Sequence, residues 1–253
     1  MKLDLALIGG TGLYALPGLG ESKRHTVETP YGTPSGDVVI GSVSGRRLAF
    51  LARHGEHHSI LPHRVNYRAN LWALQQFGAR RVIGINAVGG IRGDLGPRVL
   101  AVPDQIIDYT HGRSGSYCEL EGAEVRHVDF SEPYDAGLRR ELLDAARRAG
   151  VRVVDGGCYG ATQGPRLETR AEIERMRRDG CDLVGMTGMP EAALARELDL
   201  AYACLALVAN WAAGCGPATA GAGSVEITVG EILANLEAAT AEVPKIVGAL
   251  IES

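Results

Sequence analysis

An arginine and a histidine stand side by side at the end of an apolar run, in Leu51-Ala52-Arg53-His54. Arginine offers a planar fork of N–H donors that fits phosphate, and an adjacent histidine can donate a hydrogen bond and change its charge near neutral pH. A strand that delivers such a pair to a loop is typical of an anion-binding site. The alternative is the solvated end of a strand, so other parts of the chain have to decide between the two interpretations.

Two further apolar runs lead into glycine. Residues 3–8 run into Gly9-Gly10-Thr11-Gly12, and residues 81–86 end at Asn86, which Ala87-Val88-Gly89-Gly90 follow. Glycine lets backbone N–H groups come close to an anion, and Thr11 adds a hydroxyl. Ligands of α/β sheets bind at the ends of strands. The pattern therefore predicts that several strand ends converge on one anion.

The segment Gly10 to Ala15 also satisfies the G-x-G-x-x-A pattern of a dinucleotide-binding turn. That interpretation requires a helix that starts inside the motif, whereas Pro17, Gly18 and Gly20 follow and would break one. It also requires an acid at the end of the next strand, and Glu28 stands before a turn instead. A nicotinamide-binding oxidoreductase stays an alternative function, as does a nucleotide-binding regulatory protein.

Composition restricts the remaining possibilities. With 253 residues, 45% of them hydrophobic, the chain is long enough for one large core, and we expect a single domain over residues 1–253. The net charge of -4 and the pI near 6.0 give no electrostatic reason to expect a nucleic-acid partner. The most apolar run, residues 200–214, is shorter than the roughly 20 residues of a membrane span, and the N-terminus lacks the pattern of a secretory signal. Five cysteines without a C-x-x-C pair fit reduced thiols. We expect a cytoplasmic protein that binds neither membrane nor nucleic acid.

Hydrophobic periodicity predicts strands and helices in alternation. Two capping boxes, Thr169 to Glu172 and Thr228 to Glu231, mark the starts of helices. The pattern predicts an α/β domain whose sheet is covered on both faces. The strands are expected at residues 3–8, 38–43, 47–51, 81–86, 99–108, 151–162 (one strand or a pair), 182–186 and 201–209. One helix is expected from Pro62 to about residue 77, a second over 134–149, a third that begins at residue 170, a fourth that ends at 198, and a single C-terminal helix that begins at 229.

Five segments in this order resemble methylthioadenosine phosphorylase and its relative, the trimeric purine nucleoside phosphorylase. They are Gly9–Gly12, Leu51–Gly55, Val65–Asn70, Gly164–Arg166 and Met186–Glu191. The resemblance covers essentially the whole chain. It implies an α/β fold with a distorted mixed sheet flanked by helices, a homotrimer, and phosphate-dependent cleavage of a purine nucleoside without metal or organic cofactor.

The resemblance also assigns roles to individual residues. Met186 takes the place of the family's ribose contact, and Leu167 lies where an aromatic side chain often packs on the base. His54 and Asn210 receive the catalytic roles, at the phosphate and at the base. The family's phosphate site falls on Thr11, Arg53, His54, Asn86, Ala87 (through its backbone N–H) and Thr187.

The expected chemistry follows from charge. As the glycosidic bond stretches, the sugar becomes oxocarbenium-like and the purine gains negative charge, so the protein must hold phosphate near the anomeric carbon and supply hydrogen bonds to the base. Phosphate is itself the nucleophile. A metal site built from His54, Glu56, His57 and His58 is an alternative, but Gly55 and the loop context oppose the helix that would align His54 with His58.

The sequence departs from methylthioadenosine phosphorylases at the base. Those enzymes carry Thr-Asp-Tyr-Asp at the end of the corresponding strand. In this chain Asn210 replaces the first Asp and Ala212 replaces the second. An amide can donate to O6 and accept from a protonated N7, which favours a 6-oxopurine. Glu168 could accept from N1–H, which adenine lacks, although it could also merely support the neighbouring helix start.

At the sugar end, Val229 stands where purine nucleoside phosphorylases place a histidine for the 5′-hydroxyl, with Ile232 and Leu233 one turn on. Apolar side chains suit a methylthio group and would leave a hydroxyl unpaired; alternatively the three simply pack in the core. Both ends together predict phosphorolysis of S-methyl-5′-thioinosine to hypoxanthine and S-methyl-5-thioribose 1-phosphate. A methylthioadenosine phosphorylase that acts on a 6-aminopurine and a general 6-oxopurine nucleoside phosphorylase are the alternatives.

Overall fold

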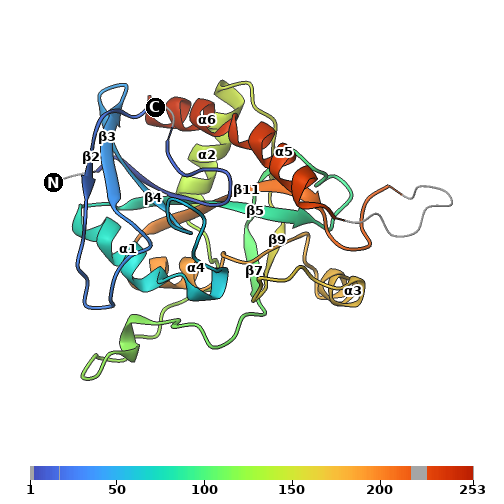
Figure 1. Cartoon of the computed structure of the whole chain (residues 1–253), viewed down its shortest axis with the longest axis horizontal. Coiled ribbons are helices and arrows are strands. Elements are labelled where there is room, and N and C mark those ends of the chain that lie inside the picture. Colours follow the sequence, from blue (N-terminus) through green and yellow to red (C-terminus); the bar gives the residue numbers. More distant parts are fainter. Residues whose placement is uncertain (1–2, 17, 218–226, 253) are drawn as a thin grey trace.

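A mixed sheet of eleven strands runs through the part of the chain that the computed structural model describes, residues 3–16, 18–217 and 227–252. Figure 1 shows this sheet as a twisted layer with helices on both sides. The architecture is a single α/β domain with a mixed sheet, as the sequence predicts.

Four parallel strands form the centre of the sheet. They are β4 (Arg46–Ala52), β1 (Leu5–Gly9), β5 (Arg81–Gly90) and β11 (Ala201–Trp211), side by side in that order. All five residues of β1 are buried, as expected of a parallel strand covered on both faces. Because β1 and β4 run parallel, the segments that follow them leave at the same edge, and the N–H of Arg53 donates to the carbonyl of Gly9 at 2.9 Å.

Shorter strands extend the sheet. β10 runs antiparallel to β5, and its residues Leu183 and Val184 pair with Gly90 and Gly89 at the end of β5. The chain after β10 therefore runs back along β5 toward the centre of the sheet. This direction brings the residues after β10 beside the middle of β5. The shorter strands are β2 (Gly20–His25), β3 (Val38–Val43), β6 (Leu100–Val102), β7 (Gln105–Asp108), β8 (Val153–Asp155), β9 (Cys158–Ala161) and β10 (Leu183–Gly185).

Helices cover both faces of the sheet (Figure 1). α2 (Ala136–Arg148), α5 (Val229–Thr240) and α6 (Val243–Ile251) contribute to one buried apolar cluster. α1 (Tyr67–Gln76) and α4 (Glu191–Glu197) contribute to another. α3 (Arg170–Arg178) packs in a third, smaller cluster beside β10, and two short 3₁₀ helices, η1 (Pro62–Arg64) and η2 (Tyr117–Glu119), lie in connections.

Side-chain caps fix the helix starts. Thr169 and Glu172 form the reciprocal capping box that the sequence predicts for α3. Thr228 accepts from the Glu231 N–H at the start of α5, but its hydroxyl donates to the Glu231 carboxylate, so the second box is incomplete. Pro62 opens η1, and α1 itself begins at Tyr67, because the side chain of Asn66 caps the Ala69 N–H.

Several boundaries differ from the sequence prediction. β5 continues through residues 86–90 and does not end at Asn86, because β11 and β10 supply partners along it. The expected strand 99–108 is broken at Pro103 into β6 and β7, which pair with different neighbours. The C-terminal helix is two helices, and β2 is an exposed edge strand whose polar residues carry no apolar alternation. Within the described residues, no helix has the length and apolarity that crossing a bilayer requires.

Candidate active site

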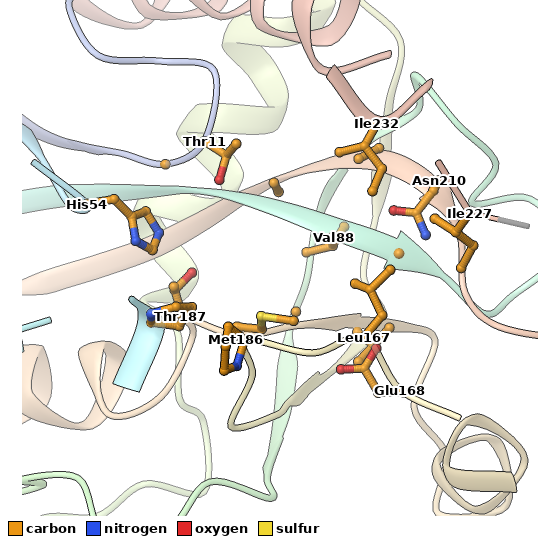
Figure 2. Close-up of a pocket in the computed structure, with 18 of the residues that line it drawn as sticks. Thr11, His54, Val88, Leu167, Glu168, Met186, Thr187, Asn210, Ile227 and Ile232 are labelled. Carbon is orange, nitrogen blue, oxygen red and sulfur yellow. The ribbon is translucent and has the colours of Figure 1, made fainter. Parts of the chain in front are cut away.

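A cavity of about 240 Å³ opens at the edge of the sheet where β1 and β4 end, alongside β5, β10 and β11. In Figure 2, Thr11, His54 and Thr187 lie around one end, which we call the anion end. Leu167, Glu168 and Asn210 lie around the other, the base end, with Met186 and Val88 between them. Ten residues predicted for the site line this one cavity: Thr11, Arg53, His54, Ala87, Leu167, Glu168, Met186, Thr187, Asn210 and Ile232.

Arg53 is fully buried at the anion end, and most of its donors already have partners. Its Nε and Nη2 donate to the two carboxylate oxygens of Glu191, at 2.7 Å each, and its Nη1 donates to the Ile85 carbonyl at 2.8 Å. Nη2 also reaches the Asn86 side-chain oxygen at 3.4 Å. A guanidinium has five N–H donors, so one Nη1 hydrogen remains for a ligand. The fork of donors expected from the sequence is directed at Glu191.

The Arg53–Glu191 ion pair belongs to a buried polar network. Glu191 is 1% exposed and also accepts from the Tyr202 hydroxyl at 2.7 Å. Burial alone would lower the pKa of Arg53, but the charge of Glu191 and its hydrogen bond reverse this, so the pKa is raised above its usual value. The network needs a glycine beneath it, since a Cβ on Gly84 would collide with the Tyr202 hydroxyl and lie 2.7 Å from Glu191 Oε1.

His54 has a defined tautomer. Its Nδ1 lies 2.8 Å from the carbonyl of Ile60, which can only accept, so Nδ1 carries the hydrogen. Burial of the imidazole, and then the positive charge of Arg53, lower the pKa of His54 to about 4. At neutral pH the ring is therefore uncharged and its Nε2 offers a lone pair, which can accept a hydrogen bond from a protonated oxygen.

Thr187 and Asn86 form a pair beside the middle of β5. The amide of Asn86 donates to Thr187 Oγ1 at 2.8 Å, which leaves the hydroxyl hydrogen of Thr187 free for an anion. Asn86 itself is fully buried and does not line the cavity. The structure therefore places Asn86 behind Thr187 and Arg53, and does not bring it to the ligand position expected from the resemblance.

The backbone around Ala87 is open on the cavity side. β5 pairs there with β1 only at residues 82–84 and with β10 only at 89–90, so residues 85–88 have no strand partner on that side among the described residues. The Ile85 carbonyl uses this gap to accept from Arg53. Backbone groups two residues apart point to the same side of a strand, so the N–H of Ala87 faces the gap as well.

The base end is shaped by a bulge in β11. The register against β5 shifts between Val208 and Asn210, and such a bulge redirects the side chains that follow it. Asn210 Nδ2 donates to the Trp211 carbonyl at 2.7 Å, which leaves Oδ1 and one amide hydrogen. Glu168 accepts from the Thr162 hydroxyl at Oε1, at 2.7 Å, which leaves Oε2. Both residues thus keep free groups that can contact a base.

The sugar end is only partly as predicted. Ile232 lines the cavity together with Ile227; in Figure 2, Ile232 lies above Leu167 and Ile227 lies beside Asn210. Val229 and Leu233 are 70% and 50% exposed and do not line the cavity. Residues 228–231 at the start of α5 are exposed, and Leu236 is the first fully buried residue of the helix. Neither the pocket position nor the core packing expected for Val229 and Leu233 occurs within one chain.

The whole chain matches a known family. Residues 4–252 match the model of the Phosphorylase superfamily. The chain belongs to this superfamily. It is 62% identical over 249 residues to a probable S-methyl-5′-thioinosine phosphorylase of Xanthomonas campestris pv. campestris, across 98% of this chain and 97% of the relative. A 6-oxopurine nucleoside phosphorylase of Pyrococcus furiosus is 46% identical over 216 residues, across 83% and 80% of the two chains. The solved methylthioadenosine phosphorylase of Schistosoma mansoni, in complex with adenine, superposes with a TM-score of 0.91 at 30% identity and covers 99% of this chain and 91% of its own.

The glycine turn of this phosphorylase differs from a dinucleotide-binding turn. The backbone has a φ of 85° at Gly12, and no helix begins between residues 10 and 16. Thr11 therefore faces the cavity from a turn. Among the described residues, no three His, Cys, Asp or Glu side chains cluster as they would around a metal ion, although the His54 and His58 rings lie 4.6 Å apart.

Sequence reasoning gave no role to several residues of the site. Glu191 binds Arg53, Tyr202 donates to Glu191, and Ile60 fixes the His54 tautomer. Glu191 stands inside a motif that the resemblance quotes, and its place on an otherwise apolar helix face, with Ala192, Leu194 and Ala195, is the signal that could have predicted a buried ion pair. Tyr202 and Ile60 carry no such signal, because their roles depend on which strands become neighbours.

Proposed function

We propose that this phosphorylase cleaves the N-glycosidic bond of S-methyl-5′-thioinosine with inorganic phosphate, and releases hypoxanthine and S-methyl-5-thioribose 1-phosphate. The observation that carries the proposal is the pair of free hydrogen-bonding groups at the base end, the amide of Asn210 and Oε2 of Glu168. The two relatives named for a 6-oxopurine nucleoside and for methylthioinosine support it.

The base end suits hypoxanthine better than adenine. Hypoxanthine carries a hydrogen on N1 that Glu168 can accept, and an O6 to which the remaining amide hydrogen of Asn210 can donate. Adenine has a lone pair at N1 and an amino group at position 6, so both contacts would be lost. A buried polar group left unpaired costs about 1–3 kcal/mol, which corresponds to roughly 5- to 150-fold discrimination per lost contact.

At the anion end, phosphate is both ligand and nucleophile. We propose that the hydroxyls of Thr11 and Thr187, the Ala87 N–H and the last free hydrogen of Arg53 bind its oxygens, and that Nε2 of His54 accepts from its protonated oxygen. One phosphate oxygen then forms a bond to the anomeric carbon while the bond to the purine breaks. The electron pair of that bond passes to the purine, which takes up a proton from water at N7 while the sugar phosphate releases its own proton to water. A hydrogen bond from N7–H to Asn210 Oδ1 then stabilises the protonated leaving group.

At the sugar end, the apolar side chains of Met186, Ile227 and Ile232 suit a methylthio group. A 5′-hydroxyl would be buried there without a partner, at a cost that a thioether avoids. Val229 and Leu233 stay predicted contacts of the methylthio group, although they are exposed in the single chain.

A substrate panel that crosses hypoxanthine and adenine with hydroxyl and methylthio at the 5′ position tests the proposal, with and without phosphate. Methylthioinosine should give the highest kcat/KM, at least about tenfold above methylthioadenosine. Asn210→Asp should raise the use of methylthioadenosine relative to methylthioinosine. Equal rates on methylthioinosine and methylthioadenosine would favour a methylthioadenosine phosphorylase. Equal rates on methylthioinosine and inosine would favour a general 6-oxopurine nucleoside phosphorylase. Release of the base without phosphate would favour a hydrolase.

We also propose that the protein works as a cytoplasmic homotrimer without metal or organic cofactor. All five cysteines are free thiols, which suits a reducing compartment. Exposed apolar side chains at the start of α5, Val229 and Leu233, suit coverage by a neighbouring subunit. Sedimentation equilibrium gives the mass of the assembly, and activity after exhaustive treatment with a chelator tests the absence of a metal.

A further inference from the structure

Arg113 binds the backbone of two turns that face the cavity. It lies in the irregular segment between β7 and α2. Its Nη1 donates to the carbonyls of Met186 and Met189, at 2.8 and 2.6 Å. Its Nη2 donates to the carbonyls of Thr162 and Gln163, at 3.1 and 3.0 Å, and its Nε to the side-chain oxygen of Gln163 at 3.2 Å. One guanidinium thus joins the turn after β9 to the turn after β10.

The partners of Arg113 are neutral oxygens. No carboxylate forms a salt bridge with it among the described residues, and its guanidinium carbon lies 5.7 Å from the centre of the Tyr67 ring. Water can solvate the guanidinium of an arginine at the surface, so the charge alone does not require these carbonyl partners. All three guanidinium nitrogens donate to residues of the two turns, so the side chain fixes the backbone of one turn relative to the other.

The turn after β10 carries the anion end. The peptide between Met186 and Thr187 is held at both ends, because Arg113 donates to its carbonyl and its N–H donates to the Tyr159 hydroxyl at 3.4 Å. The hydroxyl of Thr187 receives the Asn86 amide at 2.8 Å. With the peptide and the hydroxyl both fixed, the free hydrogen of Thr187 has a defined direction.

The turn after β9 carries the base end. Arg113 holds the carbonyl of Thr162, and the hydroxyl of the same residue donates to Glu168 Oε1 at 2.7 Å. A displacement of this turn would move the carboxylate that faces the base. Arg113 therefore lies one contact away from Thr187 at one end of the cavity and two contacts away from Glu168 at the other.

We propose that Arg113 is a positioning residue that sets the distance between the anion end and the base end, so that phosphate and purine are held together in the reactive geometry. It does not line the cavity and acts through Met186 and Thr162. The nucleoside part of this inference rests on the proposed function, whereas the phosphate part does not. A misplacement of reacting groups by about 1 Å can cost roughly 10²-fold in rate.

The test compares Arg113→Met with Arg139→Met. Arg139 on α2 is a control outside the site, because it likewise donates to two carbonyls, those of Val102 and Pro103, and in addition to the Asp155 carboxylate, on a helix that packs on the opposite face of the sheet from α1 and α4. Arg113→Met should lower kcat/KM about 10²-fold, raise the KM for phosphate and for the nucleoside, and reduce the preference for hypoxanthine over adenine. Arg139→Met should alter the melting temperature and leave these ratios unchanged. Arg113→Lys, which keeps three donors on one nitrogen, should recover part of the loss.

Calorimetric titration with inorganic phosphate alone, without nucleoside, separates this inference from the substrate assignment. Weaker phosphate binding in Arg113→Met supports a positioning role even if wild-type protein does not cleave methylthioinosine. If Arg113→Met does not fold, the same measurements on Arg113→Lys decide. Phosphate affinity and base preference equal to wild type, in a folded Arg113 variant, would overturn the proposal.

Discussion

Replacing Glu191 by glutamine tests whether the buried ion pair holds the anion end together. Glutamine keeps the shape of the side chain and one acceptor oxygen, but removes the negative charge. Arg53 would then be a fully buried cation without a counterion, since both of its shortest contacts are to the Glu191 carboxylate. The substitution therefore changes electrostatics with little change in packing.

The expected loss of stability is large. Removing one partner of a buried ion pair costs about 3–5 kcal/mol, because the other charge stays in the low-dielectric interior. Glutamine can still accept from Arg53 or from the Tyr202 hydroxyl, so we expect the lower end, about 3 kcal/mol. For a chain of this size 1 kcal/mol shifts the melting temperature by about 2–4 °C, and the predicted decrease is therefore about 6–12 °C.

Glu197→Gln is the matched control on the same helix. Glu197 also accepts two hydrogen bonds, from the Ser116 hydroxyl and the Tyr117 N–H, but forms no salt bridge within the described residues. We expect it to cost about 1 kcal/mol or less. Melting temperature and urea unfolding of both variants, with and without phosphate, give the comparison. Phosphate should raise the melting temperature more in Glu191→Gln than in wild type, because the anion then supplies the missing counterion to Arg53.

The double variant Arg53→Met with Glu191→Leu removes both charges of the buried pair. Replacing both partners of a buried pair by apolar residues is often neutral or stabilising, so this variant should be more stable than either single variant, although inactive. If Glu191→Gln is as stable as Glu197→Gln, the charge of Glu191 is not needed to hold Arg53 in place. In that case the Ile85 carbonyl and Asn86 would suffice to hold the arginine.

Two further predictions concern His54 and Gly84. The pKa of His54 is about 4 in the folded chain and 6.5 for the free side chain. As the pH falls, the unfolded chain therefore takes up the proton first. The free energy of unfolding keeps its full value above about pH 6.5 and decreases as the pH drops towards 4. His54→Gln should flatten this part of the curve of unfolding free energy against pH, and an unchanged slope would argue against the low pKa. Gly84→Ala should destabilise by about 1–3 kcal/mol or more through collision with Tyr202, whereas Gly93→Ala, with nothing within 4 Å of the added carbon, should change the melting temperature little.

The sequence predicts the parts of the site that are local in the chain. Arg53 and His54 follow an apolar strand, and Thr11 follows another, so strand periodicity alone places them at one edge of the sheet. The resemblance adds Thr187 and Met186, and these also reach the cavity. Each of these residues lies one or two positions after the end of a strand, so a pattern that is local in the sequence is enough to predict them.

What the sequence does not predict depends on contacts between distant segments. Asn86 reads as the end of a strand, but β11 and β10 extend β5 beyond it and leave Asn86 buried behind Thr187. Val229 occupies the chain position that the resemblance assigns to the 5′ contact, yet its side chain is 70% exposed. Arg113 lies in a loop without periodicity, and nothing local indicates that its donors reach two turns some 50 and 75 residues further along the chain.

The positive charge at the anion end is compensated within the protein. Glu191 compensates Arg53, His54 is neutral at pH 7, and Arg113 donates to backbone carbonyls and does not line the cavity. Phosphate would therefore meet mainly hydroxyl and N–H dipoles. A site of several free cations would bind phosphate tightly but would bind the ground state and the transition state alike, which lowers KM without raising kcat. Here phosphate must give electron density to the anomeric carbon, so a site of oriented dipoles can hold the anion in position and still leave it nucleophilic.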